Sequence, residues 1–157
     1  MPERDLLVAM TVASETRVLV VDDEPAIRAL VAKIVERAGL PVDTARDGQE
    51  AIEKIKLREY SVVVVDLMMP IVDGYALINH LRDRGGRRPA IIVVSAGDSA
   101  ALRRLDGAMV HSIVRKPFDI DVLGDLITAA ARTMETEAVE RDQTGDVLPF
   151  RRDSGVC

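Results

Sequence analysis

The stretch VVVVDLMMP, residues 62–70, joins a run of four valines to an acid and, four residues later, a proline. A short apolar run rich in β-branched residues predicts a strand covered on both faces, as in parallel sheets. Asp66 then lies where this strand leaves the sheet. Because ligands bind at the carboxyl ends of strands in open α/β sheets, Asp66 is either a solvated residue at a strand end or part of a binding site.

The rest of the chain alternates apolar runs with helical patterns, which predicts an α/β fold with a doubly wound, five-stranded parallel sheet. The predicted strands cover residues 17–21, 42–45, 62–65, 90–95 and 111–115. Apolar residues at three- and four-residue steps predict a helix over 27–38, which Gly39 ends. Further helices are predicted over residues 48–55, 74–81 and 100–105, and from Pro117 to Met134, the last one capped by Asp119 or Asp121.

Composition points to one soluble domain with modest extensions. The chain has 157 residues, of which 48% are hydrophobic and 30% charged, and its net charge is −5. An acidic chain argues against unaided binding of nucleic acid. The single cysteine, Cys157, excludes an internal disulfide and fits a reducing cytoplasm. The N-terminal LLVAMTVA is too short for a membrane span and lacks a basic region before it, so we expect neither a signal peptide nor a membrane anchor.

We expect the folded domain to cover residues 17–134, preceded by an extension over residues 1–16. The apolar period fades beyond Met134, which predicts a flexible tail over residues 135–157. That tail contains three apolar residues near its end, Val147, Leu148 and Phe150. Three such side chains by themselves are too few to offset the entropy of ordering a long segment.

Polar residues stand at the carboxyl ends of four predicted strands: Asp22 and Asp23, Asp66, Ser95 and Lys116. These ends converge where the strand order of a doubly wound sheet reverses. Three crowded carboxylates raise one another's pKa unless a divalent cation offsets their charge. Mg²⁺ suits such a site because it takes oxygen ligands and commonly bridges carboxylate to phosphate. A hydroxyl and an ammonium opposite the acids complete a pocket for an oxyanion.

Four motifs in this order resemble the receiver domain of two-component response regulators, including single-domain chemotaxis-type regulators. They are VLVVDDEP at 18–25, VVVVDLMMPIVDG at 62–74, VVSAG at 93–97 and RKPF at 115–118. Each motif alone is weak, whereas all four in order, each at a strand end, are specific. The resemblance implies a flavodoxin-like (βα)5 receiver fold over residues 17–134 with strand order 2-1-3-4-5.

The resemblance also implies roles for the acids. Asp66 matches the phosphoacceptor, whose carboxylate attacks the phosphorus of a phosphohistidine or a small phosphodonor and becomes an acyl phosphate. Asp23 matches the residue that binds Mg²⁺ directly, and Asp22 the one that reaches it through water. Met68 matches the position whose backbone carbonyl completes the metal shell. The side chains of Met68 and Met69 are interpreted as core filling, because thioethers suit soft metals.

On the other side of the site, Ser95 and Lys116 match the hydroxyl and the ammonium that contact phosphoryl oxygens. Pro117 matches a proline that commonly follows a cis peptide bond. His80 and His111 are interpreted as residues of a helix surface and a strand edge, outside any phosphohistidine relay or metal site.

The sequence departs from the family at Ile113, three residues before the lysine. The family often places tyrosine, phenylalanine or histidine there as a rotamer switch coupled to the hydroxyl residue. Isoleucine is stiff at its first side-chain torsion and has no polar tip. The resemblance therefore supports the phosphorylation chemistry but leaves the manner of output open.

The function that the resemblance implies is a stand-alone receiver, not a metabolic enzyme, phosphorylated by a sensor histidine kinase or a histidine phosphotransfer protein. Its output would reach a downstream protein through the surface formed by residues 100–105, the strand over 111–115 and the helix after Pro117. Homodimer formation stays open. The alternatives are a degenerate receiver that binds partners without phosphorylation and a phosphohydrolase of the haloacid dehalogenase type, whose D-x-D motif on the first strand is absent here.

Overall fold

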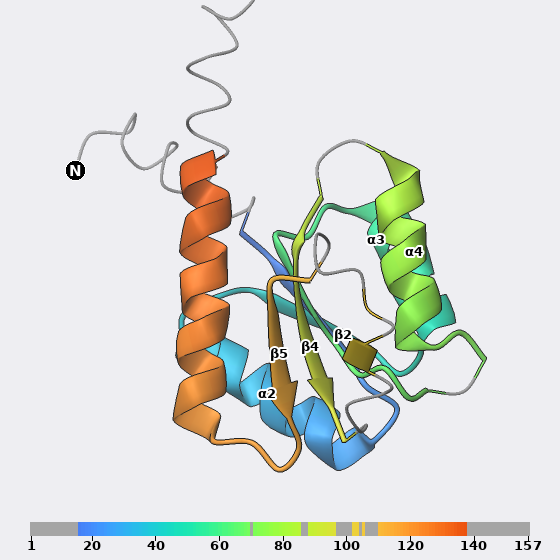
Figure 1. Ribbon diagram of the computed structural model, residues 1–157. Helices are drawn as coiled ribbons and strands as arrows, with labels where there is room; N and C mark the ends of the chain where they lie inside the picture. Colours follow the sequence, from blue (N-terminus) through green and yellow to red (C-terminus); the bar gives the residue numbers. More distant parts are fainter. Residues whose placement is uncertain are drawn as a thin grey trace, which may run out of the picture.

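The computed structural model describes residues 16–69, 71–85, 88–96, 102, 103, 105 and 110–137. Its centre is a five-stranded parallel sheet in the order β2-β1-β3-β4-β5. Figure 1 shows β4 and β5 side by side in this sheet, with helices on either side of it. The strands are β1 (Val18–Val21), β2 (Val42–Ala45), β3 (Val62–Val65), β4 (Ala90–Ser95) and β5 (Ser112–Arg115). The predicted fold class and strand order are therefore confirmed.

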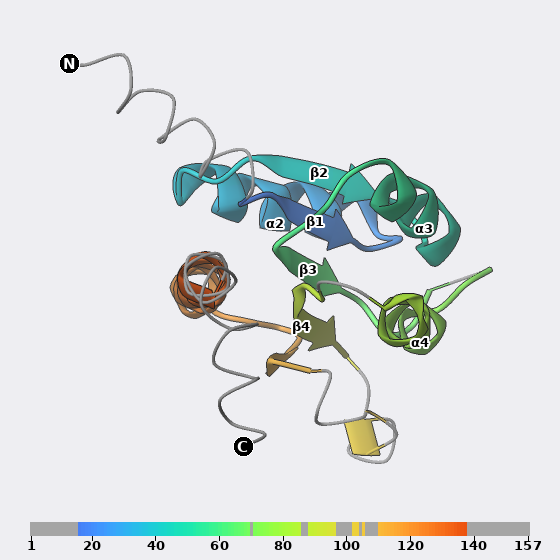
Figure 2. The same ribbon diagram turned by 90° about the horizontal axis from the view of Figure 1, so that it is seen from above.

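Helices cover both faces of this sheet. The labelled ones are α2 (Pro25–Arg37), α3 (Gly48–Leu57) and α4 (Gly74–Arg84), and residues 120–137 form a further helix. Seen from above, α2 and the helix over 120–137 lie on one face, and α3 and α4 lie on the other (Figure 2). The last helix runs three residues past its predicted end at Met134.

Parts of the sequence-based predictions fall outside the described residues. Of the predicted helix over 100–105, residues 102 and 103 are helical, whereas 100, 101 and 104 are not described. The N-terminal extension up to residue 15 and the C-terminal segment from residue 138 also lie outside.

The core explains why β3 is a run of valines. Alternate residues of a strand point to opposite faces of a sheet. Leu19 of β1 and Val63 of β3 pack with α3 and α4, while Val18 and Val62 pack with α2 and the helix over 120–137. Because both faces are covered, every residue of β1 and β3 is buried, and neither strand can alternate apolar with polar residues.

Side-chain caps fix three helix starts. Asp47 accepts a hydrogen bond from the Glu50 amide at 2.8 Å, and Asp73 accepts one from the Ala76 amide at 2.9 Å. Asp119, rather than Asp121, caps the last helix, because its Oδ1 accepts from the amides two and three residues later. These caps satisfy amide groups that have no partner inside a helix. Among the described residues, no helix combines the length and the apolar composition needed to cross a bilayer.

Candidate functional site: the acidic edge of the sheet

Two buried acids stand side by side at the carboxyl edge of the sheet. Asp22 follows β1 and Asp66 follows β3, and these strands are paired with Val21 opposite Val65. The amide of Asp66 donates to the Val21 carbonyl at 3.0 Å, which extends the pairing by one residue. One carboxylate oxygen from each of Asp22, Asp66 and the half-buried Asp23 lies within 4.8 Å of the other two. The structure thus brings together the three acids that the sequence singled out.

Lys116 reaches the same cluster from the end of β5. Its Nζ lies 3.1 Å from Asp22 Oδ2 and 3.4 Å from Asp66 Oδ2. It also lies 3.4 Å from Glu24 Oε1, a contact that the sequence did not predict. The lysine amide donates to the Ser95 carbonyl at 3.0 Å, and the peptide bond to Pro117 is cis. One ammonium therefore lies between two of the three acids.

Burial raises the pKa of Asp66, and the charge of Asp22 adds to this effect. The Met68 amide and Lys116 act in the opposite direction, but the net change is upward. Burial by itself lowers the pKa of Lys116; its hydrogen bond to Asp22 and the charges of Asp66, Asp22 and Glu24 outweigh this and raise it. The site therefore favours additional positive charge. The atoms that could bind a cation here are the carboxylate oxygens of the three acids, and oxygens are the ligands of hard cations such as Mg²⁺.

The loop after β3 holds Asp66 through its own backbone. The Met68 amide donates to Asp66 Oδ1 at 3.2 Å. The side chains of this loop diverge: Leu67 and Met69 are buried, while Met68 is 63% exposed. The interpretation of Met69 as core filling is confirmed, but that of Met68 is wrong, because the chain has left the sheet there and its side chain points to solvent.

Ser95 is the last residue of β4 and is buried. The pairing of β4 with its neighbours places Val93 beside both Val65 and Ile113. Ser95 therefore lies two residues further along, at the edge where Asp66 follows β3 and Lys116 follows β5. The serine, the acid and the lysine come from adjacent strands, as the sequence predicted.

Two residues that sequence reasoning missed position Asp22. The Nη1 atom of Arg28, on α2, donates to the Asp22 carbonyl at 2.9 Å. The Glu24 amide donates to Asp22 Oδ1 at 2.9 Å. The second bond closes a turn typical of aspartate, which the sequence could have indicated. The first depends on how α2 packs, so no local pattern could have revealed it.

Gly74 is a third residue that the sequence did not identify as part of the site. A Cβ atom at this position would lie 2.5 Å from the Asp66 carbonyl oxygen and 2.7 Å from Leu67 Cα. The glycine amide also donates to the Leu67 carbonyl at 3.0 Å. The first turn of α4 is therefore packed directly on the backbone that carries Asp66.

Ile71, in the same loop, has a left-handed backbone with φ of 67° and is 82% exposed. Such a conformation costs a β-branched residue about 1–3 kcal/mol. Asparagine adopts it more readily, and little burial is lost here. We expect Ile71→Asn to raise the free energy of unfolding by about 1 kcal/mol, measured by urea denaturation. Ile71→Val keeps the branched Cβ and should give no gain; equal gains in both variants would contradict the explanation by strain.

The remaining predicted positions lie outside the acid cluster. Ile113 is on β5 and is 45% exposed. The exposed His111 has its Nδ1 atom 3.1 Å from Ser112 Oγ, while His80 lies on α4 with a buried Nε2 atom that has no hydrogen-bond partner among the described residues. The group of side chains that could hold a metal ion in the described part of the chain consists of Asp22, Asp23 and Asp66, and it includes neither histidine.

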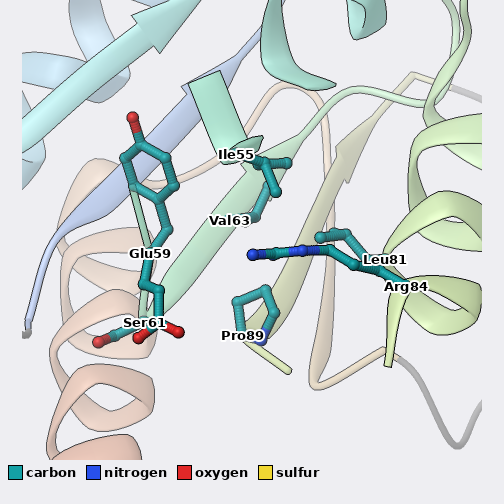
Figure 3. A pocket seen from close by; sticks show the side chains of 8 residues that line it. Ile55, Glu59, Ser61, Val63, Leu81, Arg84 and Pro89 are labelled. Carbon is teal, nitrogen blue, oxygen red and sulfur yellow. The ribbon is translucent and has the colours of Figure 1, made fainter. Parts of the chain in front are cut away.

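A small pocket lies at the opposite edge of the sheet, between the ends of α3 and α4 and the starts of β3 and β4 (Figure 3). Its lining includes Ile55, Arg84 and Pro89. The space inside is about 10 Å³, which is hardly enough for one water molecule. This pocket is therefore a packing gap and not a ligand site.

Comparisons with known proteins agree with this geometry. The family model of the response regulator receiver domain matches residues 18–128. The transcriptional regulatory protein TcrA of Mycobacterium tuberculosis is 33% identical over 120 residues, which are 76% of this chain and 47% of TcrA. The receiver domain of the Francisella response regulator 1452 has 31% identity and a TM-score of 0.66, covering 75% of this chain and 98% of that structure.

A CheY-like receiver domain protein from Methanospirillum hungatei has 27% identity and a TM-score of 0.68, covering 78% of this chain and 98% of that one. The chain belongs to the response regulator receiver family of two-component systems. It spans about half the length of the curated transcriptional regulators that it matches.

Proposed function

We propose that this chain is a phosphoryl-accepting receiver in which the Asp66 carboxylate is the nucleophile. The observation that carries the proposal is the cluster itself: three carboxylates have oxygens within 4.8 Å of one another, and the ammonium of Lys116 contacts two of them, Asp22 and Asp66. An Asp66 oxygen attacks the phosphorus of a phosphohistidine or an acyl phosphate. The bond from phosphorus to the donor's nitrogen or oxygen breaks, its electron pair leaves with the donor, and an acyl phosphate remains on Asp66.

The oxygens of Asp22, Asp23 and Asp66 fit a hard cation such as Mg²⁺; Asp23 and Asp66 would hold the ion directly, Asp22 would reach it through water, and the Met68 carbonyl would supply a further oxygen. The ion, when bound, offsets the negative charge of the acids and of the incoming phosphoryl group. Lys116 exchanges its contact with Asp66 for one with a phosphoryl oxygen, and the Ser95 hydroxyl donates to another. The 3.4 Å contact of Lys116 with Asp66 and the position of Ser95 at the same edge of the sheet support these roles, because donors held near the reacting atoms stabilise the charge that develops there.

The proposed donor is a sensor histidine kinase or a histidine phosphotransfer protein in the cytoplasm, and the chain catalyses only its own phosphorylation and dephosphorylation. Its partner would read the surface formed by residues 100–105, β5 and the helix over 120–137. We further propose that this chain does not itself bind DNA, because its net charge is −5 and binding to the phosphate backbone depends on positive charge. A sequence-specific shift at nanomolar protein and physiological salt would contradict that part.

Acetyl phosphate tests the proposal without a kinase. With Mg²⁺, we expect intact mass spectrometry to find one added phosphoryl group per chain, and with EDTA none. A constitutive binding module would gain no phosphoryl group under either condition. Continuous release of phosphate from a phosphomonoester substrate would instead support the phosphohydrolase alternative.

Ile113 leads to a prediction about output. A ligand shifts a conformational equilibrium only by its differential affinity for the two states, and a nearly complete shift takes about 5.5 kcal/mol. Without an aromatic residue at this position, we expect beryllofluoride and Mg²⁺ to shift the β5 surface incompletely, and Ile113→Tyr to make the shift more complete. Amide chemical shifts measure both. If the natural protein already converts fully and Ile113→Tyr adds nothing, the aromatic residue is dispensable here.

A further inference from the structure

A groove runs between α2 and the helix over 120–137. These two helices share one face of the sheet (Figures 1 and 2). Its volume is about 370 Å³. The helices approach closely at Gly124, where a Cβ atom would lie 3.4 Å from Ile34 Cγ2. Leu30 and Ile120, which also line the groove, are exposed. The described residues therefore leave an apolar surface uncovered.

The two rims of this groove carry opposite charges. Lys33 and Arg37 lie one turn apart on α2, and Asp121 and Asp125 lie one turn apart on the facing helix. A segment that fits the groove must be apolar in its centre and must present basic groups to one rim. An acidic residue in the same segment would pair with the basic rim.

We propose that the C-terminal segment DVLPFRR of this chain, residues 146–152, occupies the groove. Its apolar side chains, Val147, Leu148 and Phe150, cover the exposed floor. Arg151 and Arg152 follow directly and pair with the acidic rim, while Asp146 precedes them and pairs with the basic rim. The segment thus carries a charge of opposite sign for each of the two rims.

The chain is long enough for this contact. The described part of the helix ends at residue 137. At about 1.5 Å per residue, Asp125 lies about 18 Å back from that end along the helix axis. Residues 138–145, when extended, span about 26 Å. The segment can therefore return along the helix that precedes it and reach the groove.

Three apolar side chains are enough to hold this segment in the groove, although by themselves they are too few to order a tail that has no binding site. A short covalent link gives an effective concentration of about a millimolar, so even a weak site is substantially filled. A second copy at micromolar concentration competes poorly with this. Pro149 also limits the backbone freedom that binding removes. The contact does not depend on phosphorylation of Asp66.

The single cysteine, Cys157, provides the test because a nitroxide label there reports where the segment lies. In the ¹⁵N-labelled protein we expect the amide signals of residues 30–38 and 120–128 to broaden most, relative to the reduced label. Signals of α3 and α4, on the opposite face, should change little. Equal broadening on both faces, or none on either, would overturn the proposal.

Charge reversal separates a specific contact from chance proximity. Asp121→Lys with Asp125→Lys should weaken the broadening several-fold, and adding Arg151→Glu with Arg152→Glu should restore it. Failure of the restoring pair in a folded protein would contradict the assigned pairing.

A mixed sample detects a second copy of the chain as the competing occupant. It contains ¹⁵N-labelled protein without nitroxide and protein of natural isotope content that carries the nitroxide. Groove broadening in that mixture at the level of the single-protein sample would show that a second copy fills the groove and would overturn the intramolecular contact.

Discussion

Asp66→Asn is expected to abolish phosphorylation by acetyl phosphate and Mg²⁺, because the amide that replaces the carboxylate is not a nucleophile at phosphorus and supplies a weaker metal ligand. Intact mass spectrometry of the variant should find no added phosphoryl group under conditions that label the natural protein fully. The matched control is Asp83→Asn, which makes the same change on α4 at a side chain that is 73% exposed. Undiminished labelling of Asp66→Asn would place the nucleophile elsewhere.

The same variant should be more stable than the natural protein without metal. Burial raises the pKa of Asp66, so the fold favours the neutral acid, and its stabilising contribution is lost as pH rises through the folded-state pKa. Asparagine carries no charge at any pH. The stability advantage of Asp66→Asn should therefore grow as pH rises through that pKa, measured by urea denaturation in EDTA. An advantage that shrinks with rising pH would contradict this account.

With Mg²⁺ present, the natural protein should be more stable than Asp66→Asn. A ligand that binds only the folded state stabilises it by about 2.7 kcal/mol at one hundred times its dissociation constant. Asp66→Asn loses one direct ligand of the proposed site and should gain much less at the same concentration. Equal stabilisation of both proteins by Mg²⁺ would place the ion away from Asp66.

Gly74→Ala is expected to have the second largest effect, because its new methyl group has no space. The nearest atoms are backbone atoms of Asp66 and Leu67, which cannot move aside as a flexible side chain can. Overpacking of this kind costs about 1–3 kcal/mol of unfolding free energy. Moving Asp66 by a fraction of an ångström to 1 Å can also slow its phosphorylation by up to about 100-fold.

Asn79→Ala is the control for this change, since it introduces the same side chain at an exposed position of α4. It should leave phosphorylation unchanged and should not lower stability, because alanine favours helices. The measurements are urea denaturation and the rate of phosphoryl addition by intact mass. Gly74→Ala with the stability and the rate of the natural protein would show that the close approach to Asp66 is not limiting.

Much of the fold could be predicted because its signals are local. Four valines in a row require cover on both faces, and Pro25 and Gly39 mark the two ends of α2 in the chain itself. The motifs around Asp22, Asp66, Ser95 and Lys116 place these residues at strand ends, and the parallel register brings those ends to one edge.

The parts that could not be predicted depend on packing between distant segments. Arg28 reaches the Asp22 carbonyl because α2 lies against β1, and Glu24 meets Lys116 across 92 positions of sequence. Gly74 resembles an ordinary helix start in the sequence; only the approach of α4 to Asp66 gives it a role. The exposure of Met68 likewise depends on how the loop turns after β3, for which the alternation of apolar residues gives no signal.

The most direct test of the central claim is to locate the phosphoryl group. Borohydride reduces an acyl phosphate of aspartate to the alcohol homoserine and releases phosphate, which leaves a permanent mark at the acceptor. After treatment with acetyl phosphate and Mg²⁺, reduction and digestion, we predict homoserine at position 66, with Asp22 and Asp23 intact. Homoserine at either of those positions, or an acid-labile phosphoryl group on His80 or His111 instead, would contradict the assignment of Asp66 as the nucleophile.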